Sequence, residues 1–128
     1  MINPHELRVE NWVDSVFGET KVTAINMIHR EVSVYDPDRP NDPDQSHDLS
    51  FDKINPIPLT EEWLKLFGFD NFMEEGVIYS KPFFNVHLKG QKFFFKEGLF
   101  SRKIETVHSL QNLYFTFVGE ELELKTRI

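Results

Sequence analysis

The first half of the chain alternates apolar and polar residues over short stretches, a pattern that predicts β-strands. The first stretch covers residues 7–14, and two more, residues 21–28 and 31–35, follow it closely. Residues 17–19 contain a glycine and predict the first turn. Residues 51–54 regain apolar positions and are expected to rejoin the sheet. This half therefore predicts a sheet of short antiparallel strands.

Residues 59–69 carry the signals of a helix together with both of its ends. Thr60 is placed as the N-cap, where its hydroxyl accepts a hydrogen bond from a backbone N–H of the first turn. Glu61 and Glu62 then stand at the positive end of the helix dipole. Gly68 suits the left-handed residue of a Schellman ending. We expect a two-turn helix whose apolar side chains pack inward.

The second half contains a predicted β-hairpin. Its arms, residues 83–89 and 92–96, are rich in phenylalanine and flank Gly90-Gln91, a Gly-X pair that fits a type II′ turn. A further strand is expected at residues 76–79. The sheet of this half is therefore expected to be antiparallel as well.

Apolar residues recur at helical spacing from Ile104 to Val118, over about four turns. Gly119 ends this pattern, and residues 122–124 suggest a last short strand. The short strands and tight turns of the first half are similar to the opening of an SH3-like barrel. We therefore expect an α+β fold: an N-terminal SH3-like antiparallel sheet, a short helix, then a β-hairpin with a long C-terminal helix packed on it.

A length of 128 residues suits one compact domain, residues 1–128, with two subdomains, 1–56 and 57–128, as the alternative. The N-terminal subdomain would then be the SH3-like sheet. The C-terminal one would follow an α-β-β-α-β order.

The charges are distributed unevenly along the chain, whose formal net charge is −7. Residues 36–52 contain six aspartates and one arginine, whereas residues 81–103 contain six basic residues and one acidic residue. Residues 36–48 hold three prolines and no apolar residue, so we expect a flexible acidic loop there. The candidate partner contacts in this loop are Asp36, Asp38, Asp42, Asp44 and Asp48. Their spacing does not follow a calcium-binding loop.

The composition excludes several kinds of site and location. The chain has no cysteine, so disulfides, thiolate metal sites and cysteine nucleophiles are excluded. No apolar stretch approaches the roughly 20 residues that cross a bilayer. The N-terminus also lacks the pattern of a signal peptide. We therefore expect a cytoplasmic protein without a membrane partner.

The predicted hairpin has one apolar face and one face that mixes aromatic and basic residues. If Lys89 pairs with Lys92 across the turn, His87 lies opposite Phe94. Rings between lysines on a sheet stack bases and neutralise phosphates in single-strand binders. The candidate nucleic-acid or partner residues are Phe83, His87, Lys89, Lys92, Phe94 and Lys96. The alternative is structural: the long helix or the N-terminal strands cover these rings while the lysines protect the hairpin.

The sequence predicts no catalytic, metal-binding or cofactor-binding residues. The histidines have neither HxH nor HExxH spacing, no Gly-x-Ser-x-Gly turn occurs, and the glycines do not cluster into a phosphate loop. A small hydrolase would need a pocket in which polar groups converge with His29, His87 or His108. His108 lies beside the apolar stripe of the predicted helix and is expected to be exposed.

Three motifs occur in a defined order and spacing. They are Asn-Trp-Val at residues 11–13, Pro-Ile-Pro-Leu-Thr-Glu-Glu-Trp-Leu at 56–64 with Gly-Phe at 68–69, and Val-His-Ser-Leu-Gln-Asn-Leu-Tyr-Phe at 107–115 with Gly-Glu-Glu-Leu at 119–122. With these motifs the chain resembles a family of uncharacterised small proteins of gut-commensal bacteria, their phages and mobile elements. The resemblance implies a phage or mobile-element setting in a bacterial host cell, and it implies no activity. The acidic loop is longer here than is usual in that family.

The sequence therefore favours a non-enzymatic phage or mobile-element accessory protein that acts as an interaction module, with another protein as its expected partner. The alternative is single-stranded nucleic-acid binding through the basic aromatic side of the hairpin, and a small hydrolase is the third possibility. The expected location is the cytoplasm of the bacterial host, with association with the virion left open. Partner identity and oligomeric state also stay open.

Overall fold

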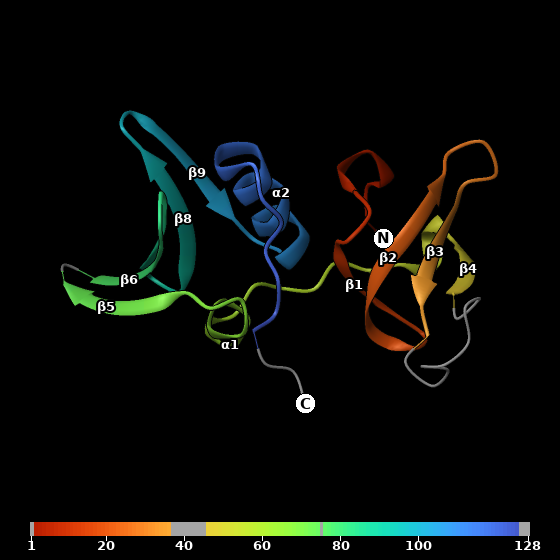
Figure 1. The fold of residues 1–128 in the computed structure, drawn as a ribbon, viewed down its shortest axis with the longest axis horizontal. Helices are drawn as coiled ribbons and strands as arrows, with labels where there is room; N and C mark the ends of the chain where they lie inside the picture. Colours follow the sequence, from red (N-terminus) through yellow and green to blue (C-terminus); the bar gives the residue numbers. More distant parts are fainter. Residues whose placement is uncertain (1, 37–45, 75, 126–128) are drawn as a thin grey trace. The chain divides into compact units, whose positions relative to one another are not determined.

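The protein is an α+β protein with two antiparallel sheets and a C-terminal helix, as the sequence predicts (Figure 1). The structure, a computed structural model, describes residues 2–36, 46–74 and 76–125. The chain divides into two compact units, Met1–Ile57 and Pro58–Ile128.

The first unit contains a four-stranded sheet in the order β1-β2-β3-β4. Its strands are β1 Trp12–Ser15, β2 Gly18–Asn26, β3 Glu31–Tyr35 and β4 Ser46–Ser50. β1 begins later than the predicted residue 7, because the preceding chain turns, after the short 3-10 helix η1 (Pro4–Glu6), instead of extending. Glu10 has a φ of 81°, and the buried Asn11 side chain accepts a hydrogen bond from the Arg8 N–H at 2.7 Å.

β4 occupies residues that the sequence pattern assigned to the acidic loop, so the prediction of a loop over the whole of 36–48 is wrong. The strand pairs antiparallel with β3, with Val32 opposite Leu49 and Val34 opposite His47. Leu49 is the one apolar residue in this strand, which is too few for a recognisable alternation. The predicted return strand at 51–54 is also wrong, since Phe51–Lys53 form the 3-10 helix η2.

The core of the first unit is built mainly from short β-branched side chains. The buried cluster contains Ile2, Leu7, Val13, Val22, Val32, Val34, Phe51 and Ile54. Beyond η2, Asn55 and Asp14 exchange two backbone hydrogen bonds of 2.9 Å, so the chain returns from β4 to β1.

In the second unit, helix α1 (Glu61–Leu66) forms as its end signals predict. The Thr60 side chain accepts a hydrogen bond from a backbone N–H of the first turn at 3.4 Å. At the other end, Gly68 has a φ of 87°. The N–H groups of Gly68 and Phe69 donate to carbonyls of the last turns at 2.9 and 3.0 Å, which completes a Schellman ending.

The second sheet has five strands in the order β5-β6-β7-β8-β9, so each strand pairs with the next along the chain. The strands are β5 Asp70–Glu74, β6 Gly76–Lys81, β7 Phe84–Lys89, β8 Lys92–Glu97 and β9 Phe100–Ile104. β7 and β8 form the predicted hairpin with the predicted pairing of Lys89 and Lys92. Gly90 and Gln91 both have positive φ values, 55° and 67°, so the turn is of type I′ and the type II′ prediction is wrong.

Helix α2 (Val107–Val118) begins three residues later than predicted, because Ile104 is the last residue of β9 and Thr106 caps the helix. Ile104 and Val107 are both buried at a spacing that continues the helical pattern, and this spacing hid the unpredicted strand β9. Gly119 ends the helix with a φ of 84°, as expected. Residues 122–124 form no strand.

α2 lies against one face of the second sheet (Figure 1), and aromatic rings fill the space between them. The Phe84 ring stacks on Phe95 at 4.4 Å between centroids and meets the Tyr114 ring edge-on at 5.2 Å. His108 and Gln111 are buried as well. The expectation that His108 is exposed is therefore wrong, because the packed face of α2 is wider than its apolar stripe.

Candidate binding face

The two faces of the second sheet differ in what covers them. α2 packs on the face that carries Phe84 and Phe95. On the opposite face, strand register aligns one residue from each of four strands in a row: Ile78, His87, Phe94 and Lys103. Alternation along β7 and β8 puts the side chains of Lys89, Lys92 and Lys96 on this same face. We call the set His87, Lys89, Lys92, Phe94, Lys96 and Lys103 the basic aromatic face.

The basic aromatic face combines partly accessible rings with exposed cations. His87 and Phe94 sit opposite each other and are both half-buried. Lys103 flanks Phe94 on the other side. All four lysines are exposed. Because neighbouring strands lie about 4.8 Å apart, a ligand over Phe94 also reaches the side chains of both flanking strands.

Burial and two of the lysines of this face lower the pKa of His87. Burial lowers the pKa of the imidazole below its ordinary value of 6.5, and the positive charges of Lys96 and Lys89 lower it further. The ring is therefore neutral near pH 7 and presents an uncharged aromatic surface beside cations.

One carboxylate offsets part of this charge at the edge of the face. Glu105 forms an ion pair with Lys103 at 2.9 Å. The pKa of this carboxyl is lowered by its hydrogen bond to Lys103 and by the charges of Lys103 and Lys92. Both side chains of the pair are exposed, so water screens the interaction and the lysines stay accessible to a ligand.

Five of the six residues that the sequence proposed for this site lie on β7 and β8. The sixth, Phe83, lies in the turn between β6 and β7 with a φ of 67° and is 91% exposed, so it is not part of the row. Lys103 was missed because the sequence analysis assigned no element to residues 97–103, and so did not place Lys103 beside Phe94. Gly98, which has a positive φ in the turn before β9, was the signal that a further strand follows β8.

Of the five aspartates that the sequence proposed as partner contacts, two lie among the described residues, and both contact the first sheet. Asp36 is buried, and one of its carboxylate oxygens lies 2.8 Å from His47 Nε2. The His47 ring in turn stacks on Phe17, with centroids 4.5 Å apart. Asp48 lies in β4, where its carboxylate accepts a hydrogen bond from the Ser33 hydroxyl. These two aspartates are therefore tied to the first sheet, whereas Asp38, Asp42 and Asp44 lie outside the described residues.

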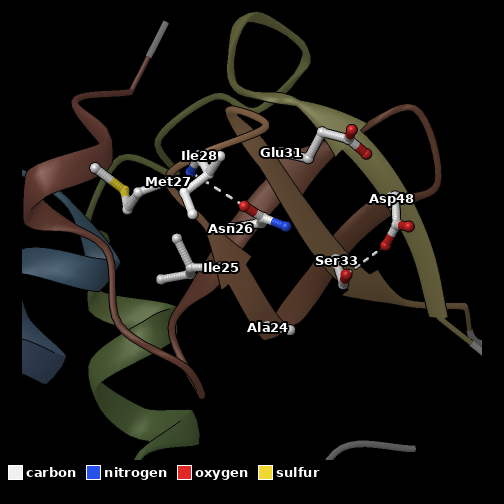
Figure 2. Close-up of a pocket in the computed structure, with 8 residues that line it drawn as sticks. All are labelled: Ala24, Ile25, Asn26, Met27, Ile28, Glu31, Ser33 and Asp48. Atoms are coloured by element: carbon white, nitrogen blue, oxygen red, sulfur yellow. Dashed lines mark hydrogen bonds between the residues drawn. The ribbon is translucent and has the colours of Figure 1, made fainter.

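A pocket of about 460 Å³ lies on the first sheet, between the ends of β2 and β3 and the adjoining part of β4 (Figure 2). Its polar wall consists of Asn26, Glu31, Ser33 and Asp48, and Ile28 and Met27 add apolar surface. The Asn26 side chain accepts hydrogen bonds from backbone N–H groups of the turn, including that of Ile28 at 3.0 Å. None of the three histidines that the hydrolase hypothesis named lines this pocket.

Within the described part of the chain, no three metal-ligating side chains form a group that could hold an ion. In residues 2–36, 46–74 and 76–125, no helix is both long and apolar enough to cross a membrane. No protein-family model, curated protein or solved structure matches the chain.

Proposed function

We propose that the protein is a non-enzymatic binding module whose basic aromatic face holds single-stranded nucleic acid. The observation that carries this proposal is the row in which Phe94 lies between His87 and Lys103, on the sheet face opposite α2. A partly exposed ring on a sheet offers a stacking platform to any base, since every base has a flat π-face. The surrounding lysines are placed to neutralise phosphates.

The overall charge of −7 does not oppose this proposal, because the acidic residues are concentrated elsewhere in the sequence. Local fields steer charged ligands more than the net charge does. The pKa of His87 is lowered mainly by burial, and the further lowering by Lys96 and Lys89 places the charges of these two lysines near the ring.

The finer architecture of the first unit is also part of the proposal: we infer an SH3-like arrangement. A four-stranded meander is followed by the 3-10 helix η2, and Asn55 then pairs with Asp14 of β1. This return to the first strand is the step that closes a small barrel. The phage or mobile-element setting implied by the sequence resemblance is likewise retained as a proposal.

The test is a fluorescence-anisotropy titration of the full chain with a labelled oligothymidine of about 16 nucleotides. We expect binding that weakens as salt rises from about 50 to 200 mM, because bound lysines release counterions. Phe94→Leu keeps an apolar side chain but loses the ring, and it should weaken binding about fivefold or more, from roughly 1–3 kcal/mol per stacked base. Phe94→Tyr keeps the ring and should retain most of the affinity.

Two matched lysine variants distinguish binding at the basic aromatic face from attraction to any positive charge on the protein surface. Lys92→Gln should weaken binding and reduce the slope of log affinity against log salt by about 0.7. Lys65→Gln removes an equally exposed lysine from α1 and should change neither. The proposal would be contradicted by a lack of binding, by an affinity that does not change with salt concentration, or by equal losses of affinity in the two lysine variants. Urea unfolding of each variant checks that the fold is kept.

A protein partner, which the sequence favours, is the second candidate. Its support is apolar surface on another part of the second unit, where Leu99, Phe100 and Phe117 are exposed. In this case a defined protein would bind with an affinity unaffected by Phe94→Leu.

A further inference from the structure

β9 is the edge strand of the second sheet, and among the described strands it pairs with β8 alone. Its residues Phe100–Lys103 are all exposed. Just past the strand, the Leu59 N–H donates to the Glu105 carbonyl at 3.0 Å, and Pro58 and Thr106 form a bridge. The chain itself therefore already pairs an extended segment with the continuation of β9, and the stretch from Phe100 to Lys103 is left open.

Large apolar side chains gather beside this open stretch. Leu99 is fully exposed in the turn before β9, and Phe100 and Phe117 are 44% and 43% exposed. The rings of Phe100 and Phe117 lie 5.7 Å apart, and each also meets the buried ring of Phe95. We call Leu99, Phe100 and Phe117 the apolar ridge. Natural edge strands usually carry charges that discourage pairing, and β9 has Arg102 and Lys103, so it is the apolar ridge beside these charges that needs an explanation.

A cation stands next to the ridge on the same side of the strand. Arg102 lies opposite Phe95, and Phe100 lies opposite Glu97, so both β9 residues are on the face that α2 covers. Arg102 is nevertheless exposed, because it is at the edge. On this side of β9, Phe100 is therefore an apolar position and Arg102 a positively charged one.

The charges of β9 indicate which kind of segment would pair with it. In an antiparallel pairing of β9 with β9 of a second copy centred on Arg102, the two Arg102 side chains would face each other at the two-fold axis. Like charges in that position destabilise a sheet. An acidic residue in the pairing segment would instead complement Arg102, which argues for a different chain with a different sequence.

We infer that β9 accepts an extended segment of a partner protein as a sixth strand. In the bound segment, an apolar side chain contacts the ridge and an acidic side chain two residues away faces Arg102, since side chains two apart share a face. The backbone groups of the open edge supply affinity, and the ridge and Arg102 supply selectivity. The side chains of the ridge and Arg102 lie on the side of the sheet opposite the basic aromatic face, with which this edge shares only Lys103, so the inference does not depend on nucleic-acid binding.

The test uses the full chain and a labelled peptide, acetyl-Gly-Thr-Val-Thr-Glu-Thr-Val-Gly-amide, in a fluorescence-anisotropy titration. A second peptide has lysine in place of glutamate, and a third has alternate backbone amides methylated. We expect the first peptide to bind and the methylated peptide to fail, because it cannot complete the ladder. The lysine peptide should bind about fivefold more weakly.

Arg102→Glu should reverse the preference, so that the lysine peptide becomes the stronger ligand. Leu99→Ser and Phe100→Ser should each weaken binding, the latter about tenfold. Phe83→Ser is the control, because it removes an exposed ring from the turn between β6 and β7, away from β9, and it should have no effect. Leu99 makes no buried contact, so its variant reports binding even if Phe100→Ser unfolds the edge.

Failure of the first peptide to bind would overturn the inference, as would equal binding of all three peptides or an unchanged preference in Arg102→Glu. Sedimentation of the chain alone adds one more outcome. A dimer that Leu99→Ser and Phe100→Ser both weaken would assign the edge to a second copy and would also overturn it.

Discussion

The two sheets of this protein are both simple antiparallel meanders, yet their cores are filled in different ways. The first is filled by valines from β1, β2 and β3 that are almost completely buried. The second is filled by rings such as Phe84, Phe95 and Tyr114. A helix lies well above the sheet it covers, and long aromatic side chains fill that gap, whereas a small sheet whose chain returns to its first strand encloses less space. Whether a helix or the sheet's own strands cover the core thus decides which apolar residues fill it.

The open faces differ as well. The pocket on the first sheet carries Glu31 and Asp48 and is lined by no basic residue. The open face of the second carries four lysines around Phe94. The net charge of −7 is therefore the sum of an acidic surface on the first sheet and a basic surface on the second. A charged ligand is attracted by the local charge of the surface that it approaches.

The largest expected effect is in the aromatic core. Phe84→Ala removes a fully buried ring that touches Phe95 and Tyr114, and it should lower the free energy of unfolding by about 3–5 kcal/mol. Each unit contains one tryptophan, so urea unfolding can be followed by Trp63 alone in a Trp12→Phe background. A loss below about 1 kcal/mol would mean that the rings are not the core of this unit.

In the first unit the corresponding change is smaller. Val34→Ala removes two buried methyl groups and should cost about 2 kcal/mol, measured through Trp12 in a Trp63→Phe background. Val16→Ala is the control, because that side chain is exposed in the turn after β1 and should change stability by less than about 0.5 kcal/mol. If the two valine variants lost the same amount, the small-residue core would not be the source of stability.

Helix capping affects the second unit, the one with α-helices among the described residues. Thr106→Ala removes the side chain that accepts a hydrogen bond from the Ser109 N–H at 3.3 Å, and it should cost about 1 kcal/mol by urea unfolding. Thr116→Ala, later in the same helix, removes a hydroxyl bonded to the Asn112 carbonyl and should be nearly neutral. Equal losses would show that β-branched side chains, and not the cap, determine the result.

The smallest effect concerns the charge of the open face. Lys96→Gln should raise the pKa of His87 as followed by NMR, while burial keeps it below 6.5. Because the folded pKa lies below the unfolded value, the unfolded chain takes up a proton first as pH falls through 6.5, and stability is lost there. This acid loss should be smaller in Lys96→Gln and unchanged in Lys65→Gln. A His87 pKa that does not respond to Lys96→Gln would place the lysine charge away from the ring.

The sequence predicted those elements whose signals are local. Helix α1 needed only its cap and the glycine that ends it, and the β7–β8 hairpin needed only a two-residue turn between alternating arms. The short turn also fixes register, which is why the pairing of His87 with Phe94 could be predicted. Five of the six residues of the basic aromatic face lie on this predicted hairpin.

The elements that were not predicted either depend on strands distant in the sequence or have a residue pattern that is typical of a different element. β4 is almost entirely polar and is held as a strand by the backbone ladder with β3. β9 continues the helical spacing of α2, so periodicity could not separate the two. Lys103 joins the basic aromatic face only because β9 pairs beside β8.

The sequence by itself determined the fold class, the helix ends and the hairpin, since caps, turns and alternation act between residues close along the chain. Alternation already separated the apolar face of the hairpin, with Phe84 and Phe95, from the face with Phe94, and only the tertiary structure decided that α2 covers the first of these faces. It also decided that Asp36 and Asp48 belong to the first sheet. Burial depends on which face a second element covers, and that choice is made by packing across the whole unit.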